Sequence, residues 1–193
     1  MSRDDRTRWD RQHAQINGAG RPASFLREII DGDGWEIARG RALDVACGKG
    51  RNALFLADRG FDVVAIDISP VRLQEGERRA REKGLAISWQ EADLESLDFP
   101  EKSFDLVINF NYLQRTLIPR LKSAVKHGGY LVFETFLIDQ QSVGRPNNTA
   151  YLLCHNELLN FCRDFRVLFY REGKFSDGKE PSFRAQILAQ KDF

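Results

Sequence analysis

Long apolar runs, a surplus of one charge and paired cysteines are all missing from this chain, and each absence excludes a class of protein. No apolar stretch approaches the roughly 20 residues that a membrane span needs, so we expect no membrane association. The formal net charge is +1, which creates no global field to attract nucleic acid. No apolar segment follows the charged N-terminus, so we expect no secretory signal.

Cysteine is scarce. The three cysteines, Cys47, Cys154 and Cys162, have neither the pairing of a disulfide framework nor the spacing of a metal site. We therefore expect free thiols in a reducing cytoplasm and no bound metal.

The remaining composition fits one packed domain over residues 1–193. Hydrophobic residues make up 42% of the chain and aromatic residues 11%. Strand-like runs end at Ala46 and cover residues 61–66, 86–90, 104–110, 130–136, 165–170 and 183–190. Helical patterns cover residues 22–30, 51–59, 70–83, 111–126 and 155–163. This alternation predicts an α/β fold with a doubly wound, mainly parallel seven-stranded sheet and an antiparallel C-terminal hairpin. Pro119 disturbs the pattern over 111–126 and could split that helix in two. Residues 127–129 predict a turn.

Two further segments could cover a binding site. Residues 1–20 are polar, but Trp9 and Ile16 lie seven apart and could share a helix face, which fits either a packed helix or a flap over a pocket. Residues 137–153 have no clear period, and a loop of that length is usually a lid, a binding loop or a disordered stretch.

The sequence A-L-D-V-A-C-G-K-G-R-N-A, from Ala42 to Ala53, predicts a strand, a tight turn through Gly48 and Gly50, and the start of a helix. Such a turn points backbone N–H groups and a positive helix end at a ligand. Asp44 adds a carboxylate just before the turn. That charge would oppose a pyrophosphate and attract an ammonium or sulfonium group, so we predict a nucleotide-like site for a cationic cofactor.

Polar residues recur where the predicted strands end. Asp44, Asp67, Asp93 and Asn109 all fall at or just past such ends, which meet at one edge of a parallel sheet. Each acid taken alone is explained by a loop cap or a turn. The set at successive strand ends favours one shared ligand.

These features resemble the class I S-adenosylmethionine-dependent methyltransferases over essentially the whole chain. The resemblance rests on the order of elements, D-V-A-C-G-K-G, the acidic end of the second strand and E-A-D-L after the third. It implies a Rossmann-like sheet. The segments R-P-A-S-F-L, F-N-Y-L-Q-R and N-N-T-A-Y-L-L are similar to the small bacterial tellurite-resistance methyltransferases. Ala46 stands where the family's first glycine normally lies, so we expect a slight displacement of the cofactor's methionine part.

The resemblance also implies roles for individual residues toward S-adenosylmethionine. Asp44 would face the methionine ammonium group, Asp67 would accept both ribose hydroxyls, and Asp93 would accept the adenine amino group. The remaining expected cofactor contacts are Ala46, Cys47, Gly48, Gly50, Ile68, Leu94 and Asn109.

The acceptor is expected to be a small molecule, and no catalytic residue is assigned. A soft anion such as a thiolate or a metalloid oxyanion would need little base catalysis, whereas an alcohol or ammonium would need a base. The candidate bases are His13, Glu134 and His155. The candidate acceptor-binding residues are Trp9, Tyr112, Arg115 and Arg145, with a surface ion pair as the alternative for Arg115.

Two other functions remain open from the sequence. Residues 48–53 satisfy G-x-G-x-x-A, which fits an NAD(P)-dependent oxidoreductase. Against that, Asp44 would sit close to the pyrophosphate, and the chain is short for a separate substrate domain. A non-catalytic S-adenosylmethionine-binding protein also fits, because no residue is an obligatory nucleophile. The sequence does not indicate the oligomeric state.

Overall fold

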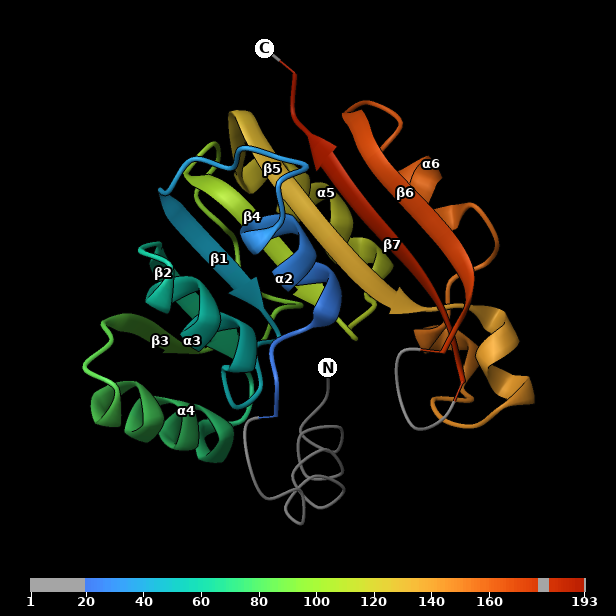
Figure 1. The fold of residues 1–193 in the computed structure, drawn as a ribbon. Coiled ribbons are helices and arrows are strands. Elements are labelled where there is room, and N and C mark those ends of the chain that lie inside the picture. The colour runs from blue at the N-terminus through green and yellow to red at the C-terminus, as the bar shows by residue number, and fades with distance from the viewer. Residues whose placement is uncertain (1–19, 177–180, 193) are drawn as a thin grey trace. The chain divides into compact units, whose positions relative to one another are not determined.

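The computed structural model describes residues 20–176 and 181–192 (Figure 1). Trp9, His13 and the rest of the predicted flap before Gly20 lie outside the described residues. The chain divides into two compact units, Met1–Phe99 and Pro100–Phe193, which are described in turn.

The first unit is built on three parallel strands. They are β1 (Arg41–Val45), β2 (Asp62–Asp67) and β3 (Ile87–Glu91). The helices are α2 (Ser24–Asp31), α3 (Arg51–Asp58) and α4 (Pro70–Glu82). In Figure 1, α3 and α4 lie side by side against these strands. Strands β1 and β2 bury most of their side chains, which explains their continuous apolar runs, whereas β3 at the edge of the sheet is half-buried or exposed.

One long-range and one local contact fix the starts of two helices in this unit. The backbone N–H of Ala23, the residue before α2, donates to Asn52 Oδ1 at 3.0 Å. Helix α4 begins after Ser69, whose hydroxyl accepts from the N–H of Arg72, and Pro70 occupies the first turn, where no N–H is needed.

The second unit combines two parallel strands with an antiparallel hairpin. The strands are β4 (Phe104–Phe110), β5 (Val125–Phe136), β6 (Arg166–Phe175) and β7 (Ser182–Gln190). Strand β7 pairs antiparallel with both β5 and β6. The short helices are η1 (Arg115–Leu117), α5 (Ile118–Ala124), η2 (Ile138–Ser142), η3 (Thr149–Tyr151) and α6 (Glu157–Phe161). The strand order β3-β2-β1-β4-β5-β7-β6 confirms the predicted seven-stranded, mainly parallel sheet with an antiparallel C-terminal hairpin.

In the second unit one prediction holds only in part and another is wrong. The helix expected over residues 111–126 is shorter and is divided into η1 and α5, as the split alternative predicts, with Pro119 in the first turn of α5. The turn expected at residues 127–129 lies within β5. Phe104 pairs with Val125 but Leu106 pairs with Tyr130, so the residues between them bulge from the ladder.

The segment 137–153 is ordered by its ends and by its own short helices. An isolated bridge joins Leu137 to Leu153, and both side chains are buried. The helices η2 and η3 fall inside it, where the sequence shows no period. A function as a lid remains a prediction. In the described part of the chain, no helix has the length and apolar character needed to cross a membrane.

Trp89 on β3 requires glycine at two positions of the first unit. A Cβ built on Gly50, in the turn after β1, would lie 2.2 Å from the Trp89 ring, and one on Gly76 in α4 would lie 2.6 Å from it. Gly50 also has φ of 72°, which side chains disfavour. The indole therefore fills the space between the turn and α4.

This packing predicts that Gly50→Ala destabilises the protein far more than a glycine substitution with open space around it. We expect a loss in free energy of unfolding of about 3 kcal/mol or more, from overpacking and left-handed strain together. Gly84 has φ of +67° with nothing within 4 Å of a Cβ, so Gly84→Ala should lose only about 1–2 kcal/mol. Urea denaturation of both variants checks this, and equal losses would contradict the Trp89 contact.

Candidate functional site

The turn after β1 is wound by three residues with left-handed backbone. Ala46 has φ of 53°, Gly48 of 59° and Gly50 of 72°. Within the turn, the backbone N–H of Cys47 still pairs with β2, donating to Ile66 O at 2.9 Å. Ala46 thus adopts the conformation that glycine tolerates best, at a cost of roughly 1–2 kcal/mol for a residue with a Cβ. This explains why glycine is the usual residue at this place in the resembling family.

Asp67, the last residue of β2, fixes this turn. Its Oδ2 accepts from the N–H of Gly48 at 2.7 Å, and its Oδ1 accepts from the N–H of Ser69 at 3.0 Å. The side chain is buried. Each carboxylate oxygen has a second lone pair, so the expected contact with two ribose hydroxyls is compatible with these bonds.

Asp44 on β1 is buried with an incomplete set of partners. Among the described residues, nothing donates to its Oδ2. Burial raises the pKa of the Asp44 carboxyl to about 7, against a hydrogen bond from the Ala53 backbone and the charge of Arg51, which both lower it. An unpaired buried acceptor is costly, so this oxygen indicates a missing donor or cation.

Arg72 is a residue of this region that the sequence patterns do not single out. It lies in the first turn of α4, and a Cβ built on Gly48 would lie 3.6 Å from its guanidinium carbon. Within the described ranges its Nε is buried without an acceptor. A cation beside the glycine turn can donate to a ligand, and only the fold brings it there.

Asp93 stabilises the loop after β3 through hydrogen bonds to its backbone. Its Oδ1 accepts from the N–H of Glu95 at 2.9 Å, and its backbone oxygen accepts from the N–H of Ser96 at 3.1 Å. Leu94 is buried and Ile68 is half-buried. Since β1, β2 and β3 are parallel and adjacent, the structure brings their carboxyl ends together within this unit. The adenine contacts of Asp93, Ile68 and Leu94 remain predictions.

Cys47 is buried within the turn, and burial raises the pKa of its thiol well above the usual range. Cys154 and Cys162 are free as well. No group of three or more His, Cys, Asp or Glu side chains in residues 20–176 and 181–192 could hold a metal ion.

The polar residues after β4 lie in the second unit. Asn109 is buried, its Nδ2 donates to Tyr112 O at 2.7 Å, and its Oδ1 has no partner in the described part of the chain. The Tyr112 hydroxyl donates to the side chain of Gln114. Their predicted contacts with cofactor and acceptor remain predictions.

The two arginines proposed for the acceptor differ in their surroundings. Arg115 donates to both carboxylate oxygens of Glu157, and to the backbone oxygens of Ala150 and Leu152. These bonds hold the segment before α6. They correspond to the alternative in which Arg115 forms a surface ion pair. The side chain of Arg145 is exposed, and its backbone oxygen accepts from Gln140 Nε2.

The candidate bases are engaged where they are described. Glu134 on β5 is buried, and its two oxygens accept from Arg184 at 2.6 Å and from Gln186 at 2.7 Å. His155 Nε2 lies 2.6 Å from Asp139 Oδ2, and this carboxylate raises the pKa of the exposed imidazole. Both groups are therefore already hydrogen-bonded, and Glu134 is paired with a cation.

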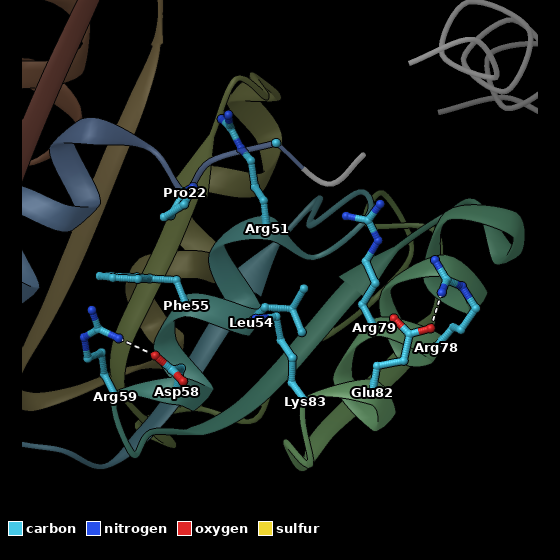
Figure 2. A pocket seen from close by; sticks show the side chains of 11 residues that line it. Pro22, Arg51, Leu54, Phe55, Asp58, Arg59, Arg78, Arg79, Glu82 and Lys83 are labelled. Atoms are coloured by element: carbon cyan, nitrogen blue, oxygen red, sulfur yellow. Dashed lines mark hydrogen bonds and ion pairs between the residues drawn. The ribbon is translucent and has the colours of Figure 1, made fainter. Parts of the chain in front are cut away.

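A separate groove of about 520 Å³ lies over α3 and α4 (Figure 2). Its apolar residues include Leu54 and Phe55, and ion pairs such as Arg59–Asp58 and Arg78–Glu82 border it. None of the predicted cofactor contacts lines it. We therefore locate the candidate site at the strand ends of the first unit rather than in this groove.

Residues 42–129 match a family described as a methyltransferase domain. The chain is 41% identical over 69 residues to an uncharacterized protein of Mycobacterium tuberculosis, covering 36% of this chain and 25% of that protein. It is 42% identical over 74 residues to a demethylmenaquinone methyltransferase of Thermus thermophilus, covering 37% and 34%. These matches thus span about a quarter to a third of the relatives' own lengths.

Among solved structures, TehB from Haemophilus influenzae aligns with a TM-score of 0.78 at 22% identity, covering 95% of this chain and 66% of that one. A second, described as a SAM-dependent methyltransferase from Methanosarcina mazei, aligns at 0.68 and 19% identity, covering 90% and 100%. The domain match over residues 42–129 and the shared fold bear out the predicted resemblance to a methyltransferase of this fold.

The bonds made by Asp67 predict a stability cost for its amide analogue. Asp67→Asn keeps the shape but offers only one acceptor oxygen, so either Gly48 N–H or Ser69 N–H is left facing an NH₂ group. We expect the free energy of unfolding to fall by about 1–3 kcal/mol. Asp62→Asn on the same strand is the control, because that side chain is 75% exposed and should change stability by less than about 0.5 kcal/mol. Thermal or urea denaturation decides, and equal stability of the two variants would rule out this role.

Proposed function

We propose that the protein is an S-adenosylmethionine-dependent methyltransferase that acts on a small-molecule acceptor. The match of residues 42–129 to a methyltransferase domain and the shared fold support this. The observation that supports this most is the buried carboxylate of Asp44, whose Oδ2 has no donor in the described residues. It stands two residues before a left-handed turn that opens a helix. A pyrophosphate would be repelled at this position, so the oxidoreductase alternative is disfavoured.

The residues present fit the cofactor. Asp44 Oδ2 supplies an acceptor for the methionine ammonium group, and the charge of that group would hold the carboxyl in its ionised form. Asp67 keeps a lone pair on each oxygen for the ribose hydroxyls while it holds the turn. When bound, the cofactor supplies an electrophilic methyl group on a sulfonium.

The two candidate bases that the structure describes are both engaged, which supports an acceptor that needs no base. Glu134 is already bonded through both oxygens, and His155 is paired with Asp139 on the surface. An acceptor that arrives as a soft anion needs no proton removed. We therefore favour a thiolate or a metalloid oxyanion. The protein's part is then to align the nucleophile with the methyl group and exclude water.

Calorimetry with S-adenosylhomocysteine and with NAD tests the cofactor assignment. We expect binding of the sulfur nucleoside only, and the reverse result would establish a dinucleotide protein. A mass-spectrometric screen with thiols, tellurite and selenite then tests the reaction, and we expect methylated product from at least one. Binding of S-adenosylhomocysteine without turnover of any acceptor would favour the non-catalytic alternative.

The raised pKa of Asp44 predicts that cofactor affinity depends on pH. Below pH 7 the empty site holds a neutral carboxyl, which must lose its proton to face an ammonium group. The dissociation constant of S-adenosylhomocysteine should therefore rise by up to about tenfold for each pH unit below 7, and level off above it.

Calorimetry between pH 5.5 and 7.5 checks this dependence. Asp44→Asn should remove it and weaken binding at pH 7.5, whereas the exposed-site variant Asp62→Asn should keep the profile of the unmodified protein. A flat profile in the unmodified protein would show that Asp44 does not face the ammonium group.

A further inference from the structure

Arg184 occupies a position of the second unit where ligands of α/β proteins usually bind. It lies near the start of β7 and pairs across the ladder with Phe136, the last residue of β5. Its guanidinium also contacts Asn111, directly after β4. The carboxyl ends of β4 and β5 therefore both border this side chain.

The guanidinium is held in one place by contacts on three sides. Its Nε donates to Ser182 Oγ at 3.1 Å. Its Nη1 donates to Glu134 Oε1 at 2.6 Å and to Asn111 Oδ1 at 2.8 Å. Its carbon atom lies 4.3 Å from the centre of the Phe136 ring. A guanidinium fixed in this way loses little conformational entropy when it binds a ligand.

One edge of this guanidinium is left for a ligand. Nη2 carries two N–H donors that no described residue accepts, and 22% of the side chain is exposed. Glu134, its counter-ion, is only 6% exposed, so an incoming molecule meets the cation rather than the carboxylate. Gln186 donates to the second oxygen of Glu134, which stabilises the carboxylate independently of Arg184.

A second group at the same strand end also has capacity for a ligand. Asn109 lies two residues before Asn111, and its Oδ1 is buried with no donor in the residues that the structure describes. The end of β4 thus offers a hydrogen-bond acceptor, while β7 offers a cation with two donors. This combination suits a polar small molecule that carries an oxyanion.

We propose that Arg184 binds an anionic oxygen group of the methyl acceptor and so selects acidic acceptors over neutral ones. This assignment rests on the proposed function, because acceptor selection is measured as methyl transfer. The oxyanion is either a carboxylate attached to a thiol or the metalloid oxyanion itself, and the experiment separates these sources.

Methylation of matched acceptors tests the selection. The probes are 3-mercaptopropionate, its neutral counterpart 2-mercaptoethanol, and selenite. For whichever of 3-mercaptopropionate and selenite is methylated, we expect Arg184→Gln to lower kcat/KM by about ten- to hundredfold, mainly by raising KM. For 2-mercaptoethanol we expect kcat/KM to change by less than about twofold. Arg184→Lys should recover part of the loss. Arg166→Gln removes the same charge from an exposed position on β6 and should have no effect.

Arg184→Gln leaves the buried Glu134 without its cation, so a folding defect must be separated from lost binding. The double variant Arg184→Gln with Glu134→Gln removes both charges of the pair. It should fold as the unmodified protein does and still lose the preference for the anionic acceptor. Equal losses for anionic and neutral acceptors in both variants would show that Arg184 has only a structural role.

Binding of 3-mercaptopropionate and of selenite without any cofactor separates this inference from the proposed function. In a ¹⁵N-arginine NMR titration, we expect a saturable shift of the Arg184 signal with one of them, absent with 2-mercaptoethanol. A shift in a protein that binds no S-adenosylhomocysteine would support the anion site and contradict the methyltransferase. No shift in a protein that methylates neutral thiols would overturn the anion site alone.

Discussion

The carboxylate of Asp67 joins the parts of the chain on which the candidate site depends. Through Gly48 N–H it holds the turn that follows β1, and through Ser69 N–H it holds the start of α4. One side chain at the end of β2 thereby fixes the positions of two neighbouring connections. Because the bonds are buried, they do not compete with water and remain strong.

The fold leaves acceptors unsatisfied where a ligand would supply donors. Asp44 Oδ2 and Asn109 Oδ1 are both buried near the ends of strands, and neither has a donor within the described residues. For Asp44 the cost appears as a raised pKa, since burial disfavours the charged form. A cationic ligand would offset that cost, so the same desolvation that weakens the empty protein favours the complex. A neutral ligand group would gain less from this arrangement.

Patterns along the chain predict those features that depend on local sequence. Alternating strands and helices indicate the sheet, and the glycine turn with Asp44 indicates the site, because both follow from residue type and spacing. The division of the helix near Pro119 is predicted, but its extent is not, since only residues 115–124 are helical. The prediction fails at residues 127–129, where a bulge makes glycines part of a strand.

The residues that sequence reasoning misses depend on contacts between distant positions. Arg184 meets Glu134 from 50 residues away, and no spacing rule connects a cation on one strand with a carboxylate on another. Arg72 comes to lie beside Gly48 because Asp67 and Ser69 place the start of α4 there. Arg115 pairs with Glu157, which lies 42 residues further along the chain. Such pairs become visible only when the register of the strands is known.

The packing of Trp89 against Gly50 and Gly76 restricts the order in which these three positions can change during evolution. Neither glycine can gain a methyl group while the indole fills the space beside it. A smaller side chain at position 89 must come first, and it would leave a void until a glycine is replaced. A side chain at Gly50 stays strained at φ of +72°, and a Cβ on Gly76 would lie 3.1 Å from Lys49 O, so replacing either glycine stays costly even without the indole. Homologues that keep the indole should therefore keep both glycines.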